Sequence, residues 1–331
     1  MKNGLIRFNF FLDQLQVLLT RASKQKNPAL WLYQNNARTP LFMLEGLAKL
    51  YAGIHDKKKF AKIKEHFKLL EDVLGAIDYY DAFAKEFTKN KHIPGTVTGY
   101  LQAQTREKIQ SLNEMLKENG WLGDDNKRMS KIRKKLDKAD WLKEKDEMEK
   151  IAAFYGSSIA TITAFAGKSN FHFKNVEADV HELRRKLRWL SIYPQALRGC
   201  IQLSKGKAQP KYLAKYLTKE IITSPFNIIP DAGDDQYILL LEKNYFYALS
   251  WMIAALGKLK DNGLRVIVIK EALQQTAVIS DGAAFKKAYA FTGTGQPHIR
   301  QLLDDADALC KTYFKENNLQ KLLLGITSVK P

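Results

Sequence analysis

Four basic side chains occur at helical spacing in the segment from Val180 to Ile201. A helix turns by about 100° per residue, so it would gather these four within one arc of about 100° and place leucines on the opposite side. Like charges at this spacing repel one another by roughly a few tenths of a kcal/mol per pair in water. Such a helix therefore has either a solvated basic face or one that an anion neutralises. The four residues are His181, Arg184, Arg185 and Arg188.

The whole chain is strongly basic. Its 331 residues include 53 lysines and arginines against 35 aspartates and glutamates, a formal charge of +18. This excess indicates an acidic partner, of which a nucleic acid, an anionic membrane surface and a polyanion such as polyphosphate are the main classes.

Lysines also crowd the first half of the segment 57–88, while aspartates occupy its second half. The helix dipole favours the opposite order, because cations are more stable near a helix C-terminus. The stability of an isolated helix therefore does not explain why the lysines are placed there. A solvated helix face still explains each lysine taken singly. The lysines are Lys57, Lys58, Lys59, Lys62, Lys64 and Lys68.

Hydrophobic spacing predicts helices along the whole chain and no alternating strand set. The expected helices are residues 5–23, 41–54, 57–88, 96–119 and 126–165, followed, after a break at 166–170, by 174–203, 212–222, 237–261, 264–274, 297–315 and most of 318–326. The first should bury Ile6, Phe10, Leu15 and Leu18. The predicted fold is all-α, with two antiparallel helical bundles related by an approximate internal repeat. We expect an N-terminal half, residues 1–168, and a C-terminal half, residues 169–331, that carries the basic helix.

The start of the chain does not resemble a signal peptide, because Arg7 and Asp13 interrupt its apolar residues. No apolar run approaches the length of about 18 residues that a membrane span needs. Cys200 and Cys310 lack CxxC spacing, and we expect two buried, reduced thiols. These features predict a cytoplasmic protein.

A weak internal sequence similarity supports the idea of two related halves. The segment Leu74–Asp81 resembles Leu256–Asp261, and each begins with Leu-Gly late in a long helix. A glycine inside a helix costs about 1 kcal/mol relative to alanine, so Gly75 and Gly257 are expected to mark close approaches between helices.

The basic quartet, followed by an LG-x-x-x-D segment, resembles the CHAD family, the conserved histidine α-helical domain. The resemblance covers roughly residues 38–261. It implies two similar four-helix bundles related by pseudo-symmetry. It also implies that histidine and basic side chains line a central positive surface that binds inorganic polyphosphate, and an association with polyphosphate granules would follow.

The first half departs from the family pattern. If Leu44 corresponds to Leu183, Phe42 takes the histidine position, Glu45 the first arginine position and Lys49 the third. Ser191 stands where the family tends to place a further arginine. Either the binding face of the first half has decayed, or the lysines between Lys57 and Lys68 replace it.

We therefore expect a non-enzymatic protein that binds a polyanion, foremost polyphosphate, in a basic groove between its halves. No cofactor or metal is expected, because the six histidines form no HxxxH or HExxH pair and no serine or cysteine has a nucleophile motif. One alternative is a nucleic-acid-binding helical protein that uses Trp121, Trp141, Trp189 and Tyr212. Another is a diverged family member with only a scaffold role. The predicted binding residues are His181, Arg184, Arg185, Arg188, Lys49, Lys57, Lys64 and Lys68.

Overall fold

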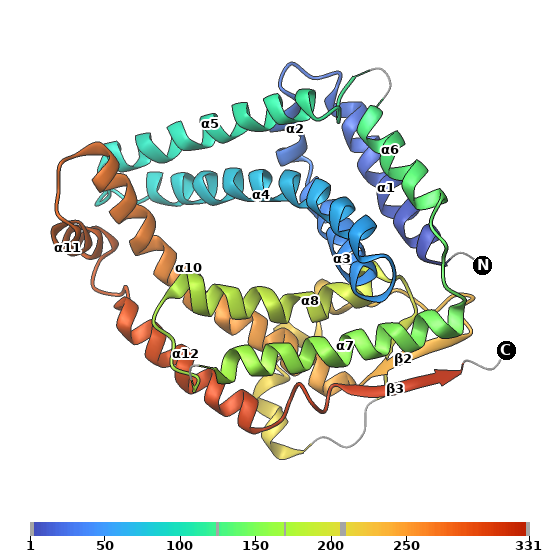
Figure 1. Ribbon diagram of the computed structural model, residues 1–331. Helices are drawn as coiled ribbons and strands as arrows, with labels where there is room; N and C mark the ends of the chain where they lie inside the picture. Colours follow the sequence, from blue (N-terminus) through green and yellow to red (C-terminus); the bar gives the residue numbers. More distant parts are fainter. Residues whose placement is uncertain (1–2, 124–125, 169, 206–209, 329–331) are drawn as a thin grey trace.

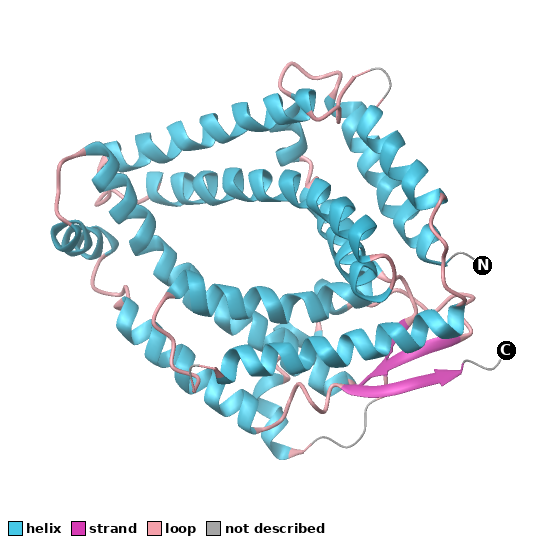
Figure 2. Cartoon of the chain, viewed as in Figure 1, coloured by secondary structure: helices cyan, strands magenta, loops and turns pink. Residues whose placement is uncertain are grey.

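The computed structural model describes residues 3–123, 126–168, 170–205 and 210–328. This part of the chain is mostly helical with three short strands, which confirms the predicted all-α class (Figure 2). Four helices lie around the middle of the molecule: α3 (Arg38–Ile54), α4 (Lys57–Thr88), α8 (Glu182–Ala196) and α10 (Lys243–Thr276). The others are α1 (Asn3–Ala22), α2 (Pro28–Gln34), α5 (Gly95–Glu118), α6 (Lys127–Asp137), α7 (Glu144–Gly167), α9 (Lys219–Ile222), α11 (Asp281–Thr292) and α12 (Ile299–Lys315).

The middle helices follow one another as α3, α4, α10 and α8 (Figure 1). α3 packs against both α4 and α8, while α10 packs against α8 and, near its other end, against α5. α5 lies outside α4, and α7 lies outside α8. α3 thus contacts both the lysine-bearing helix α4 and the basic helix α8.

α4 has the bounds that its sequence predicts. Apolar side chains three or four residues apart, from Phe60 to Ile77, are buried along one face. At its start, the Asp56 carboxylate accepts a hydrogen bond from the backbone N–H of Lys59, at 2.9 Å. Such a cap satisfies one of the N–H groups that have no partner in the first helical turn. The apolar period and the cap together explain why the helix begins at Lys57.

A three-stranded sheet replaces three segments that were predicted to be helical. β1 (Ile201–Leu203) pairs in parallel with β2 (Tyr237–Leu241), and β2 pairs antiparallel with β3 (Leu323–Ser328). The run Tyr237–Leu241 is apolar at every position, and such a short run has no periodicity that separates a buried strand from a buried helix. The helix begins only at Lys243, where the Glu242 carboxylate accepts a hydrogen bond from the backbone N–H of Tyr245.

Other predicted boundaries were also wrong. Residues 126–165 form two helices, α6 and α7, rather than one. Residues 212–222 form a 3-10 turn at Lys211–Tyr216 and the short helix α9. Residues 264–274 continue α10 without a break, and Gly263 lies inside the helix against Val176.

The buried face of α1 differs from the predicted one. Ile6 is 52% exposed and Phe10 37% exposed, whereas Leu15 is buried as expected. The adjacent residues Phe8 and Phe11 are buried instead. Phe8 belongs to an aromatic cluster with Tyr51, Phe60 and Trp141, and this contact determines which side of α1 faces inward.

One large core contains side chains from both predicted halves, including Leu44 of α3 and Leu187 of α8. A second, smaller core joins the far ends of α4 and α10 with α5 and α11. The division at residue 168 and the internal repeat stay predictions. Cys200 and Cys310 are free and buried, as expected. Among the described helices, none combines the length and apolar character that crossing a bilayer requires.

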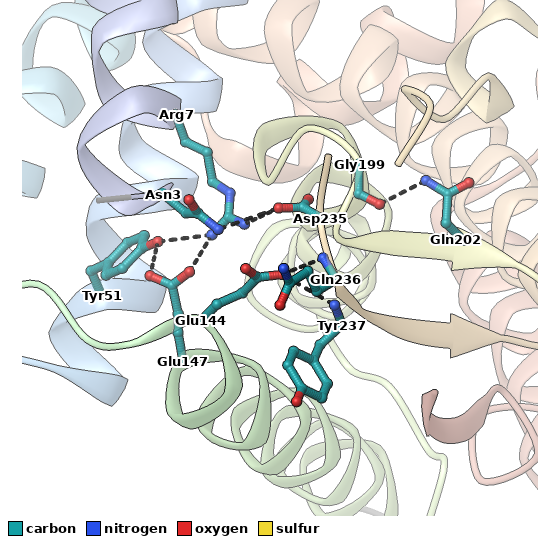
Figure 3. Close-up of polar contacts among 10 residues, drawn as sticks. All are labelled: Asn3, Arg7, Tyr51, Glu144, Glu147, Gly199, Gln202, Asp235, Gln236 and Tyr237. Atoms are coloured by element: carbon teal, nitrogen blue, oxygen red, sulfur yellow. Dashed lines mark hydrogen bonds and ion pairs between the residues drawn. The ribbon is translucent and has the colours of Figure 1, made fainter. Parts of the chain in front are cut away.

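A buried ion-pair network connects three helices and the loop before β2 (Figure 3). Arg7 of α1 donates hydrogen bonds to Glu147 of α7, at 2.6 Å, and to the hydroxyl of Tyr51 of α3, at 3.2 Å. Tyr51 donates in turn to Glu147 at 2.8 Å, and Asp235 lies 3.6 Å from the Arg7 guanidinium. The network holds α1 and α7 against the end of α3.

Replacing Glu147 with glutamine should destabilise the fold strongly, because Arg7 would remain buried without its main counterion. Losing one partner of a buried pair costs about 3–5 kcal/mol, and urea unfolding followed by circular dichroism measures the change. The matched control is Asp13→Asn, which breaks the exposed pair between Asp13 and Arg133. That change should cost less than about 1 kcal/mol. Equal losses for both variants would contradict a structural role for the network.

Candidate anion-binding surface

The predicted basic helix begins with a π-helical turn and is shorter than expected. The turn covers Val176–His181 and continues directly into α8, which ends two residues beyond Pro194. The sequence predicts that Pro194, which lacks a backbone N–H, kinks or ends this helix, and α8 does end close to it. The predicted extension to residue 203 was wrong, because Ile201–Leu203 form β1. The leucine face is buried as predicted, at Leu183, Leu187 and Leu190.

Arg184 packs against the backbone of α10. Its Nε donates a hydrogen bond to the carbonyl oxygen of Ile253 at 3.1 Å. A Cβ atom at Gly257 would lie 2.9 Å from the same nitrogen, so the absence of a side chain there leaves space for the guanidinium. Burial lowers the pKa of Arg184, and the charge of Asp261 partly offsets that effect. Gly257 thus marks a close approach, as predicted, and the group that approaches it is a cation.

Arg188 packs against an aromatic ring of α3. Its guanidinium carbon lies 4.3 Å from the centre of the Phe42 ring, and that of Arg38 lies 5.2 Å from the same ring. Burial lowers the pKa of Arg188, as do the charges of Arg184 and Arg38. Arg38 is bound by Glu71 and Asp78, at 2.7 and 2.8 Å.

Lys49 of α3 contacts an aromatic ring of α8. Its ammonium lies 4.7 Å from the centre of the Trp189 ring of α8. Burial lowers the pKa of Lys49 to about 8, and the charges of Lys186, Lys64 and Arg185 act in the same direction, while that of Glu45 opposes them. Cations from α3, α4 and α8 therefore act on one another at this point.

We call six cations of α3, α4 and α8 the basic cluster. Within the described residues, four of its members, Lys49, Lys64, Arg184 and Arg188, form no ion pair with a carboxylate. The other two members share Glu182, which lies 2.6 Å from Arg185 and 2.9 Å from Lys186. The basic cluster consists of Lys49, Lys64, Arg184, Arg185, Lys186 and Arg188.

The remaining predicted residues are neutralised or lie apart. The ring of His181 hydrogen-bonds Glu177 through Nδ1 at 2.7 Å, and Lys68 pairs with Asp72 at 2.5 Å. Lys57 is exposed in the first turn of α4, and none of the interactions found in the described part of the chain connects it with the basic cluster. The basic cluster thus contains five of the eight predicted residues: Lys64 and Arg185 act on Lys49, and Arg184 acts on Arg188.

Two features of the surface were missed from the sequence. One is Lys186, whose charge acts on Lys49. The other is the pair of rings Phe42 and Trp189, each of which contacts a cation. Glu45 is buried beside them, and burial together with the charge of Glu71 raises its pKa to about 6. Glu45 and Lys49 are four residues apart, and this spacing could have predicted that they lie side by side on one helix face.

All four aromatic residues considered for base stacking have contacts within the protein, and the Tyr212 hydroxyl lies 2.9 Å from that of Tyr245. Trp121 is 2% exposed, Trp189 is covered by Lys49, and the indole N–H of Trp141 donates to the carbonyl oxygen of Leu136. Two cavities of about 350 and 390 Å³ lie along the middle and the second half of α10, and none of the eight predicted residues lines them. No group of three histidine, cysteine, aspartate or glutamate residues in the described ranges could hold a metal ion.

Comparisons of the chain with protein-family models, with curated proteins and with solved structures found no match. The likeness to the CHAD family therefore stays a resemblance of motifs. Any functional argument has to come from the geometry of the basic cluster.

The ionisation of Glu45 should make anion binding depend on pH. A carboxyl with a raised pKa gains its negative charge only as the pH rises through about 6, and that charge opposes an anion at Lys49. Binding of tripolyphosphate should therefore strengthen by about threefold to tenfold between pH 7.5 and pH 5.5. Isothermal titration calorimetry at constant ionic strength measures this difference.

Glu45→Gln is the matched variant, since it keeps the size of the side chain and removes its charge. It should bind more tightly than the wild type at pH 7.5 and show a smaller change toward pH 5.5. His181 is present in both proteins, so the difference between their pH profiles reports Glu45. Identical profiles would show that this carboxyl does not act on the bound anion.

Proposed function

We propose that this chain is a non-enzymatic polyanion-binding protein and that its ligand is inorganic polyphosphate, bound across α3, α4 and α8. The observation that carries the proposal is the presence of partly buried cations without a paired carboxylate. Removing a cation from water is unfavourable unless an opposite charge compensates. A bound anion would supply that charge.

The chemistry of the cluster suits phosphate. A guanidinium presents a planar fork that can bind two oxygens of one phosphate, and two of the unpaired cations are arginines. Both guanidinium groups are held by contacts within the protein, that of Arg184 with the backbone of α10 and that of Arg188 with the Phe42 ring. Less side-chain freedom then remains to be lost when the anion binds.

The distribution of the cluster suits a polymer. Its members come from three helices, with Lys64 on α4, Lys49 on α3 and the others on α8. A chain with about one charge per phosphate could contact several of them at once and release counterions, so its affinity should fall steeply with salt. A nucleic acid would share the electrostatic term, but single-stranded binding usually adds base stacking, for which Trp121 and Trp189 are not free.

Replacing Arg184 and Arg188 together with alanine should weaken binding of long-chain polyphosphate by at least about tenfold, because each charge-assisted contact is worth about 1.5–3 kcal/mol. The control is Arg106→Ala with Arg300→Ala, which removes the same charge from exposed positions outside the cluster. That variant should lose less than about threefold. Fluorescence anisotropy with a labelled polyphosphate, at two salt concentrations, measures both affinities.

Competition separates the two classes of polymer. Polyphosphate should displace a labelled single-stranded DNA at a far lower phosphate concentration than DNA displaces polyphosphate. If both arginine variants lost the same amount of polyphosphate affinity, net charge alone would explain the loss, and the assignment of the site would be overturned. Preferential binding of DNA would overturn the assignment of the ligand.

A further inference from the structure

The lysines in the first half of α4 are distributed over different sides of that helix. Lys64 belongs to the basic cluster, and its charge acts on that of Lys49 of α3. Lys62 precedes Lys64 by two residues, so the two side chains leave the helix about 160° apart. Lys62 is exposed and forms no ion pair with any described carboxylate. α4 therefore presents a second cation without a counterion, on a side away from the basic cluster.

Cations from α4 and α6 surround the ring of His66. The Arg128 guanidinium lies 3.2 Å from Nε2 of His66, and its Nε donates a hydrogen bond to the carbonyl oxygen of Asn119 at 2.8 Å. Burial lowers the pKa of His66 to about 4. The charges of Arg128, Lys135 and Lys62 act in the same direction. At pH 7 His66 is thus a neutral acceptor for Arg128, and it adds no negative charge to this group.

We call Lys62, Arg128 and Lys135 the α4–α6 cations. None of the three pairs with a carboxylate in the described ranges. Other cations of the same helices, Lys59 and Arg133, do pair with aspartates, at 3.8 and 2.6 Å. Like charges gathered in this way repel one another, and an anion lying against them removes that repulsion.

The outer face of α4 connects the α4–α6 cations with the basic cluster. Lys57, Lys58 and Glu65 lie on the arc between Lys64 and Lys62, and all three are exposed. Two lysines against one glutamate leave this arc with a net positive charge. A path across it is about 20 Å long, since a helix with its side chains has a radius of about 5–6 Å and a bound polymer lies outside that radius.

We propose that long-chain polyphosphate binds the basic cluster and the α4–α6 cations at once, crosses the outer face of α4 between them, and is thereby preferred to short chains. This inference rests on the proposed function and specifies its ligand. Binding at one group raises the local concentration of the rest of the chain at the other group, so the two contacts reinforce each other. Tripolyphosphate is too short to cover the path and contacts one group only. The proposal also explains why lysines crowd the first half of α4, where the helix dipole disfavours them.

Replacing Lys62 and Lys135 together with alanine tests the second contact. Both lie outside the basic cluster, and neither pairs with a described carboxylate, so the fold should be kept. Affinity for long-chain polyphosphate should fall by at least about fivefold, whereas affinity for tripolyphosphate should change by less than about twofold. The salt dependence of long-chain binding should also weaken by about 0.7 for each lost phosphate contact. Fluorescence anisotropy measures long-chain binding, and isothermal titration calorimetry measures tripolyphosphate binding.

The matched control is Lys286→Ala with Lys311→Ala, which removes the same charge from exposed positions of α11 and α12. Its affinity for both ligands should stay within about twofold of the wild type. With chains of graded length, the wild type should show a step in affinity at the first length that covers the path. The Lys62 and Lys135 variant should lose that step.

Three other outcomes would contradict the proposal, each at a different point. The same smooth rise of affinity with chain length in the wild type and the lysine variant would overturn this inference and leave the proposed function intact. Equal losses of tripolyphosphate and long-chain affinity in the lysine variant would show a single site in place of two. If long-chain binding depended on Lys62 and Lys135 but not on Arg184 and Arg188, the binding site of the proposed function would be overturned instead.

Discussion

The close packing of α3 against α8 is the constraint on which the basic cluster depends. A Cβ atom at Gly46 would lie 3.2 Å from the Ile192 side chain and 3.3 Å from the Trp189 ring, so side chains of α8 pack directly on the backbone of α3. This approach brings the Phe42 ring to Arg188 and the Trp189 ring to Lys49. Each helix thereby supplies the aromatic support for a cation of the other.

Carboxylates divide the basic surface into neutralised and unneutralised parts. Glu182, Glu71 and Asp72 each bind cations in their neighbourhood, so much of the positive charge on these helices is already compensated. Three of the four cations that remain, Lys49, Arg184 and Arg188, lie against ring faces or helix backbone. A cation on a ring face keeps its charge while losing part of its hydration, which leaves it able to bind an anion. This division, rather than the total charge of +18, is what makes the cluster a candidate site.

The sequence was sufficient for features that repeat along α4 and α8. The period from Phe60 to Ile77 gave correct bounds for α4, and the leucine face of α8 is buried as predicted. The pairing of His181 with Glu177 is also a contact at fourfold spacing, and it could have been predicted from that spacing. Tyr237–Leu241 was misjudged because an unbroken apolar run of five residues has no period.

Contacts between helices were beyond what the spacing reveals. Phe42 seemed to be a loss from the family pattern, yet it is the ring on which Arg188 rests. Gly257 signalled a close approach without showing that Arg184 makes it. These pairs depend on how α3 and α10 cross α8, and a single sequence carries no record of such crossings.

The structure of the chain bound to tripolyphosphate, determined by crystallography, would test the central claim most directly. We predict phosphate density in contact with Arg184 or Arg188 of α8 and with Lys49 of α3. α6 offers a competing basic surface, with Lys131 and Lys134 exposed. Phosphate bound on α6 and absent from the basic cluster would contradict the account.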